Sequence, residues 1–85
     1  MSELRETRLK RLRLRAWHRG IKEMDLILSA YAEANLAGMT ADGLDLYDAL
    51  LEENDQDLYQ WVTGQAATPA RFGALVGDIA QTFQN

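Results

Sequence analysis

The chain has 85 residues, of which 47% are hydrophobic and 26% charged, a composition typical of one small globular domain and too apolar for a disordered chain. It contains no cysteine, which excludes disulfides, thiolate zinc sites and cysteine nucleophiles and is in keeping with a reducing compartment. No apolar run approaches the roughly 20 residues that a membrane helix needs. We therefore expect residues 1–85 to form a single domain without membrane insertion.

The first two predicted helices are separated at His18-Arg19-Gly20, because glycine favours a turn or a helix end. The first helix has apolar residues on one side and arginines on the other. These apolar residues are Leu4, Leu9, Leu12 and Ala16. The second helix carries its apolar residues at steps of three and four: Ile21, Met24, Ile27, Leu28 and Tyr31. Gly38 stands where a C-terminal cap of this helix belongs.

Capping residues delimit three further helices. Thr40 can cap a third helix, and either Asn54 or Asp55 can cap a short fourth one. We expect the fifth helix to start with Thr68 as its cap and Pro69 in its first position. The apolar residues of these helices again follow helical spacing: Leu44, Tyr47, Leu50, Leu51, Leu58, Trp61, Val62, Phe72, Leu75, Val76, Ile79 and Phe83.

The fourth helix is expected to end at Gly64, and short connections join all the predicted helices. No stretch of alternating β-branched residues competes with the helical pattern. The sequence therefore predicts an all-α fold, a compact single-domain bundle of about five short helices. Tryptophan, tyrosine and phenylalanine at helical spacing, with Trp17 and Trp61 among them, are interpreted as core residues.

Charge is distributed very unevenly along the chain. Eight of the nine basic residues lie in residues 1–22 against two acids, a net charge of +6, whereas residues 23–85 hold one arginine against eleven acids, a net charge of −10. The basic first helix can be a solvated face, a membrane-surface helix or a docking surface for an acidic partner. We favour the docking surface, since arginine pairs bidentately with carboxylates. A nucleic-acid binder would need a basic domain rather than one basic quarter.

Few residues point to catalysis or to metal binding. His18 is the single histidine, and it is either a helix-end residue with one hydrogen bond or a partner contact. Asp42, Asp45 and Asp48 lie three residues apart, and Glu52 continues the row; we interpret them as a solvated acidic face rather than a cation site. The glycines do not cluster into a phosphate-binding loop. These residues alone predict a helical protein-binding module with no catalytic and no metal-binding residues.

The stretch from Arg15 to Asp25 resembles the signature of the SdhE-type FAD assembly factors of succinate dehydrogenase. Their hallmark is Arg-Gly-x-x-Glu followed by x-Asp, which here is Arg19, Gly20, Glu23 and Asp25. A second block of residues is similar to the family at the same spacing: Leu44, Tyr47, Leu50, Leu51, Glu52, Asn54, Asp55, Asp57, Leu58, Tyr59 and Trp61. The family often has arginine at the position of His18.

The resemblance implies a non-catalytic assembly factor. Such proteins bind the flavoprotein subunit of succinate dehydrogenase (respiratory complex II), and in bacteria also that of fumarate reductase, and promote covalent attachment of FAD to a histidine of that client. It implies that FAD is held by the client, with none bound stably by this chain. Because the mitochondrial members carry a targeting extension, we expect a bacterial, cytoplasmic protein, and we expect a monomer when it is free.

The resemblance also assigns site residues. We expect the client to contact six of them: Arg11, Arg15, His18, Arg19, Gly20 and Glu23. If the second helix starts near Arg19, then Arg19 and Glu23 share one face, and Gly20 lets a client backbone approach closely. Asp25 would brace the first helix through Arg15 or His18, and Trp17 and Trp61 would support the motif. The alternatives are a generic helical adaptor and, less favoured, a small nucleic-acid-binding regulator.

Overall fold

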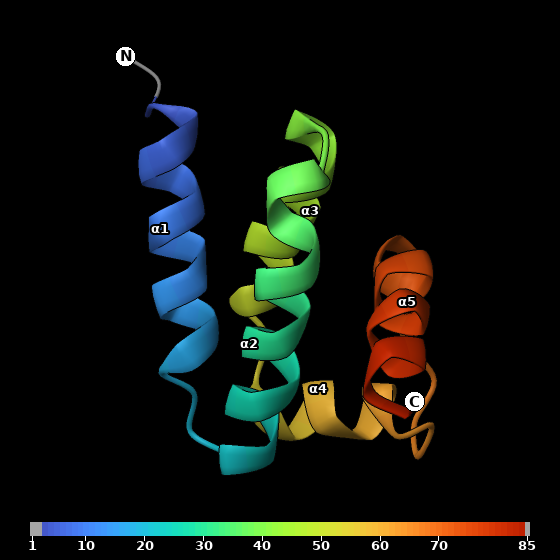
Figure 1. The fold of residues 1–85 in the computed structure, drawn as a ribbon. Helices are drawn as coiled ribbons and strands as arrows, with labels where there is room; N and C mark the ends of the chain where they lie inside the picture. The colour runs from blue at the N-terminus through green and yellow to red at the C-terminus, as the bar shows by residue number, and fades with distance from the viewer. Residues whose placement is uncertain (1–2, 85) are drawn as a thin grey trace.

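The computed structural model describes residues 3–84, and in this range it contains helices and no strand. The five α-helices are α1 (Arg5–Trp17), α2 (Lys22–Asn35), α3 (Ala41–Leu51), α4 (Asp55–Val62) and α5 (Gly73–Gln84). Two short 3₁₀ helices, η1 (Leu36–Gly38) and η2 (Ala70–Phe72), precede α3 and α5. In Figure 1, α1, α2, α3 and α5 stand upright, and α4 crosses below. The all-α prediction is confirmed, and no helix of this range is long and apolar enough to span a bilayer.

Three of the predicted capping residues act as the sequence indicates. The Gly43 backbone N–H donates to Thr40 Oγ1 at 3.1 Å, so Thr40 caps α3. The Gln56 N–H donates to Asn54 Oδ1 at 2.8 Å, so Asn54 rather than Asp55 caps α4. Gly64 follows α4 with φ of 80°, a left-handed conformation that glycine adopts at little cost.

Two other helix ends differ from the prediction. Gly38 is not a left-handed cap; it closes η1, in which the Met39 N–H donates to Leu36 O at 3.1 Å. The tighter 3₁₀ turn satisfies the last carbonyls of the helix without a left-handed residue. Pro69 lies just before η2 instead of in the first position of α5. The 3₁₀ turn that follows it brings Phe72 into the core, where it is 2% exposed.

The hydrophobic core surrounds α2, which contacts α1, α4 and α5. Its fully or almost fully buried residues come from every helix: Leu12, Ala16, Met24, Ile27, Leu28, Tyr31, Ala32, Leu36, Leu44, Tyr47, Leu50, Leu51, Leu58, Val62, Phe72, Leu75, Val76 and Ile79. Tyr31 and Tyr47 stack with ring centroids 6.0 Å apart. Tyr47 donates to Leu28 O at 3.0 Å and Tyr31 to Asp78 Oδ2 at 2.6 Å. Burial raises the pKa of Tyr47, and both hydroxyls connect helices through the core.

Three residues predicted to be buried are exposed: Leu4 (75%), Trp17 (59%) and Phe83 (47%). Leu4 precedes the first turn of α1, and Phe83 lies in the last turn of α5 at the edge of the core, so neither is covered on all sides. Trp17 is one residue past the buried Ala16, about 100° around the helix. Trp17 is therefore not a core residue. Trp61 is half-buried and stacks on Phe72 with centroids 6.1 Å apart.

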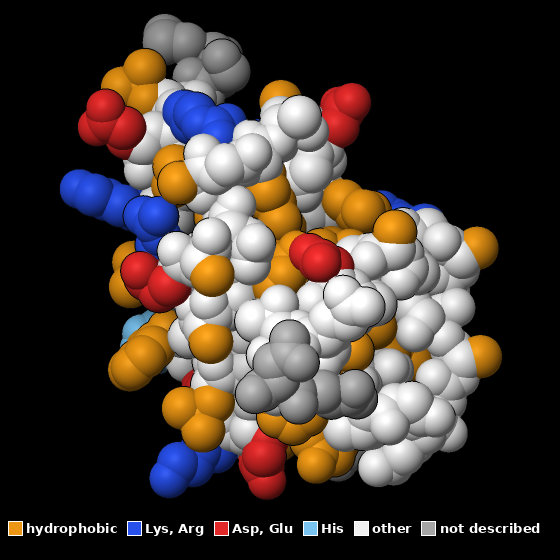
Figure 2. Space-filling model, turned by 45° about the vertical axis from the view of Figure 1, so that its right-hand side comes forward, with side chains coloured by type: hydrophobic (Ala, Val, Ile, Leu, Met, Phe, Trp, Pro, Cys, Tyr) orange, Lys and Arg blue, Asp and Glu red, His pale blue; other side chains and the backbone are white. Residues whose placement is uncertain are grey.

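The basic helix α1 pairs with the acidic row on α3. The ion pairs join Arg8 to Asp45, Arg11 to Asp48, and Arg15 to both Asp48 and Glu52. Asp48, at 28% exposed, departs from the predicted solvated acidic face, because the fold places arginines over it. Asp45 and Glu52 stay solvated as predicted, at 66% and 74% exposed, although each also pairs with an arginine. The same pairs occupy arginines that were expected to be free for a partner. Figure 2 shows Lys and Arg side chains mainly along one edge of the molecule, with hydrophobic side chains exposed over its middle.

The α1–α3 ion pairs predict a loss of stability in acid. Burial alone would raise the pKa of Asp48, but hydrogen bonds from Arg11 and Arg15 outweigh it and hold that pKa below its ordinary value. A carboxyl with a lowered folded-state pKa contributes stability above its unfolded pKa of about 4, and this contribution is lost as the pH falls through the folded value. Melting temperature measured from pH 6 to pH 2 should thus fall more steeply for the wild type than for Asp48→Asn.

Asp42→Asn provides the matched control for this experiment. Asp42 is exposed in the first turn of the same helix, and the described ion pairs between α1 and α3 do not involve it. Its variant should follow the wild-type pH profile. Equal slopes for Asp48→Asn and the wild type would contradict the stabilising role of the pairs.

Candidate functional site

Arg19 connects the turn between α1 and α2 to the corner between α3 and α4. Its Nε donates to Asp55 Oδ1 at 2.7 Å, and its two terminal nitrogens donate to the carbonyl oxygens of Leu51 at 2.8 Å and Glu53 at 3.1 Å. The guanidinium thus binds carbonyls left free at the C-terminal end of α3. The Arg19 side chain is only 9% exposed. We call Arg19, Gly20, Leu51, Glu53 and Asp55 the corner junction.

Gly20 belongs to the same junction through its backbone. Its N–H donates to Asp55 Oδ2 at 2.6 Å, so each carboxylate oxygen of Asp55 accepts a hydrogen bond from this turn. A Cβ on Gly20 would lie 3.1 Å from Asp55 Oδ2, closer than side chains normally pack. The atom that approaches Gly20 is therefore a carboxylate oxygen of its own chain, which gives an internal reason for glycine at this position.

Asp25 braces the turn, but not through the partners that the sequence indicated. Asp25 Oδ1 accepts a hydrogen bond from the Arg19 backbone N–H at 2.6 Å, rather than one from Arg15 or His18. Because α1 ends at Trp17, the Arg19 N–H lies outside both helices and needs such an acceptor. Asp25 therefore holds the turn between α1 and α2, whereas the sequence predicted that it would brace α1 itself.

Arg19 and Glu23 do not share a helix face. The prediction required α2 to start near Arg19, but α2 begins at Lys22, and Arg19 turns toward Asp55. Arg19 lines a shallow hollow of about 390 Å³ together with Leu14, Arg15, His18, Leu51 and Glu52. Glu23 instead lines a separate groove of about 270 Å³ between α2 and α5. The fold therefore places Arg15, His18 and Arg19 at one hollow and Glu23 at another, while Arg11 and Gly20 line neither.

His18 and Arg15 both line the hollow beside the junction, but only Arg15 is engaged in ion pairs within the chain. His18 is exposed and caps α1 by donating its backbone N–H to Leu14 O at 3.1 Å. Arg15 is paired with Asp48 and Glu52. Across the residues that the structure describes, no three potential ligands gather into a metal site.

Comparison with known proteins identifies the family. The model of the family described as "Flavinator of succinate dehydrogenase" matches residues 10–83, which include the corner junction, Glu23 and Asp25. The chain belongs to this family.

Curated members of the family share substantial sequence identity with the chain. "Succinate dehydrogenase assembly factor 2, mitochondrial" of Mycosarcoma maydis is 41% identical over 71 residues, covering 84% of this chain and 30% of the relative. The protein of the same name from Aspergillus terreus is 41% identical over 85 residues, covering 86% and 29%. That of Candida glabrata is 58% identical over 45 residues, covering 53% and 29%. The chain thus spans about 30% of the length of these flavinator-family relatives, whose names describe an assembly factor.

The family signature is partly a structural motif in this chain. Arg19 and Gly20 hold the corner through Asp55, and Asp25 in α2 accepts a hydrogen bond from the Arg19 backbone N–H. This role of Asp55 was not predicted from the sequence, where Asp55 appeared as a possible helix cap and as one of the family-like residues. The available signal was the occurrence of Asn54-Asp55 in the second block of family-like residues. Spacing could not reveal it, because Arg19 and Asp55 are 36 residues apart.

Proposed function

We propose that the chain is an assembly factor that binds the flavoprotein subunit of succinate dehydrogenase and promotes covalent attachment of FAD to a histidine of that subunit. The observation that carries this proposal is the family match over residues 10–83. The fumarate reductase flavoprotein is a second proposed client. FAD enters as a substrate held by the client, and residues 1–85 act as one domain that is monomeric when free.

The proposed mechanism assigns the bond-forming chemistry to the client. Holding the reacting groups of a bound client in one geometry lowers the entropic part of the barrier. A factor that binds this geometry more tightly than others accelerates the reaction without a nucleophile of its own. The corner junction suits such a task, because hydrogen bonds to Arg19 and Gly20 hold three helix ends in a defined arrangement.

The structure supports different roles for the proposed contact residues. His18 and Glu23 are exposed on either side of the turn, and we propose that they and the backbone at Gly20 touch the client. Arg19 is assigned as a positioning residue, because its side chain is engaged within the chain. Client contacts by Arg11 and Arg15 stay a prediction. Because both arginines pair with Asp48, a client would have to compete with that carboxylate for them.

A bacterial cytoplasmic location is also proposed, although the named relatives are mitochondrial. Its support is the absence of cysteine from the sequence, which agrees with a reducing compartment. Cell fractionation with an antibody against the chain tests it, and recovery from an organelle would contradict it.

Flavin fluorescence in a denaturing gel tests the proposed function. Purified apo flavoprotein subunit of succinate dehydrogenase is incubated with FAD, with or without the chain, and then denatured. Only covalently attached flavin stays with the client band. We expect the chain to increase this fluorescence several-fold over an equal amount of an unrelated helical protein. Equal fluorescence in both samples would contradict the proposal.

A further inference from the structure

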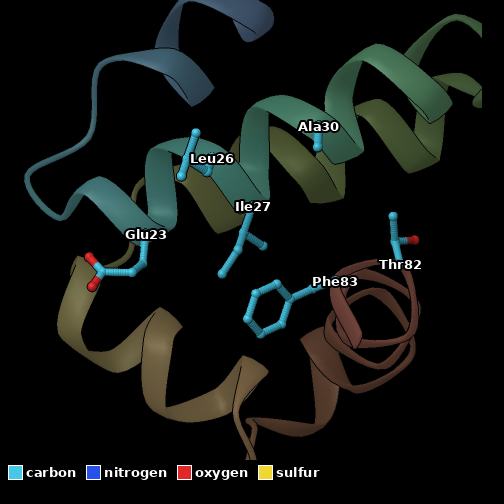
Figure 3. Close-up of a pocket in the computed structure, with 6 residues that line it drawn as sticks. All are labelled: Glu23, Leu26, Ile27, Ala30, Thr82 and Phe83. Carbon is cyan, nitrogen blue, oxygen red and sulfur yellow. The ribbon is translucent and has the colours of Figure 1, made fainter. Parts of the chain in front are cut away.

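The groove between α2 and α5 is apolar along its length and acidic at one end. Glu23, Leu26, Ile27 and Ala30 recur at steps of three and four along α2, and Thr82 and Phe83 close the other side from α5. In Figure 3, the side chain of Ile27 points toward the ring of Phe83, and the carboxylate of Glu23 lies at one end.

Large apolar side chains remain in contact with water at this groove. Leu26 is 61% exposed and Phe83 47% exposed, although both neighbour the core residue Ile27. Two large hydrophobic residues beside one hollow form a patch that a partner can cover with gain in free energy. The exposure of Leu26 and Phe83 therefore indicates a contact surface rather than unfinished core packing.

The charge of the groove restricts what can cover it. Among residues 3–84, Glu23 is the only charged residue that lines it, and in the same range no cation lies within ion-pair distance of Glu23. Placing an apolar partner over this end would desolvate the carboxylate, which costs free energy unless a cation accompanies it. A complementary partner thus carries apolar side chains and one lysine or arginine.

We propose that this groove binds a segment of the client flavoprotein in which a lysine or arginine stands next to large apolar side chains. The basic side chain would pair with Glu23, and the apolar side chains would pack on Leu26, Ile27 and Phe83. This inference rests on the proposed function and extends the client surface from the α1–α2 turn along α2 to the C-terminal end of α5.

A second copy of the chain is a poorer occupant. Three of the arginines of α1, Arg8, Arg11 and Arg15, are already paired with acids of α3 and are less free to pair with Glu23 of a second copy. A stable dimer also needs roughly 800 Å² buried on each partner, which a groove lined by six residues does not supply. The groove fits better as one part of a larger interface with another protein.

Client affinity measured with groove variants tests the proposal. The probe is the purified flavoprotein subunit of succinate dehydrogenase, and its Kd is measured for the wild type, Glu23→Lys, Leu26→Ser and Phe83→Ser. We expect each variant to weaken binding about tenfold, because a contact at a desolvated interface centre is lost. Melting temperatures should stay near that of the wild type, since the substituted residues are exposed.

Leu4→Ser is the matched control. Leu4 is an exposed leucine like Leu26 but lies before α1, so its variant should bind within about twofold of the wild type. Glu23→Gln separates charge from shape: it should weaken binding less than Glu23→Lys, which adds repulsion against the client's cation.

Cross-linking identifies the occupant directly. A photoreactive benzoylphenylalanine in place of Phe83 should attach to a client segment that contains lysine or arginine beside apolar residues. A cross-linked species of twice the chain's mass, or attachment to an acidic client segment, would overturn the proposal.

The two proposals fail in different ways. If the wild type binds no client and raises no covalent flavin, both are wrong. If the wild type binds and raises covalent flavin but Leu26→Ser and Phe83→Ser bind equally well, the groove assignment alone is wrong.

Discussion

Asp55→Ala is expected to lower the free energy of unfolding by about 3 kcal/mol. Removing one partner of a largely buried ion pair leaves the other charge without compensation, and the Arg19 side chain is only 9% exposed. The Gly20 N–H would lose its acceptor as well. For a domain of this size, such a loss lowers Tm by more than about 10 °C, which thermal unfolding followed by circular dichroism measures.

Asp57→Ala is the control for this prediction. Asp57 is in the same first turn of α4 and is exposed, so it shares the favourable position of an acid at a helix N-terminus with Asp55. Its loss should cost no more than about 1 kcal/mol. Similar melting of the two variants would mean that the corner junction does not stabilise the fold.

A double variant tests whether Arg19 and Asp55 act together. Replacing Arg19 by methionine and Asp55 by leucine removes both charges and leaves apolar groups of comparable size. The combined loss should be smaller than the sum of the two single losses, since neither charge is left without its partner. Additive losses would indicate that Arg19 stabilises the corner only through the carbonyls of Leu51 and Glu53.

Gly20→Leu is expected to destabilise the chain by about 1–3 kcal/mol. The new Cβ would lie 3.1 Å from Asp55 Oδ2, and this oxygen cannot easily move because Asp55 is bound by Arg19 and by the Gly20 N–H. Inserting atoms into a closely packed site shifts the surrounding groups at this cost. Covalent flavin on the client should also decrease, because the substitution displaces the turn that carries His18 and precedes Glu23.

Gly38→Leu is the matched control for Gly20→Leu. A Cβ on Gly38 meets no atom within 4 Å, and Gly38 does not have a left-handed conformation. Its variant should melt at or slightly above the wild-type temperature, because the unfolded chain loses conformational freedom.

In the combined variant Gly20→Leu/Asp55→Ala, the clash is absent and the losses of stability should not add. An unchanged Tm for Gly20→Leu would mean that packing within this chain does not require glycine at position 20.

The sequence by itself determined the helices and most of the core. Thr40, Asn54 and Gly64 act at helix ends through neighbours two or three residues away, so their effect can be predicted from the local sequence. Buried residues such as Leu28, Leu50 and Ile79 follow from spacing at three and four residues, because that spacing places them on one face of a helix. The motif that points to the flavinator family is likewise a continuous stretch.

Only the tertiary structure decided which charged residues meet. The basic helix and the acidic row are separate features in the sequence, but the fold pairs Arg15 with Asp48, 33 residues away. Arg19 binds Asp55, 36 residues away, instead of lying beside Glu23. Electrostatic and hydrogen-bond energies depend on distance in space, and the path of the chain through its turns sets that distance. For the same reason, the exposure of Leu26 and Phe83 in one groove could be recognised only after α2 and α5 were placed side by side.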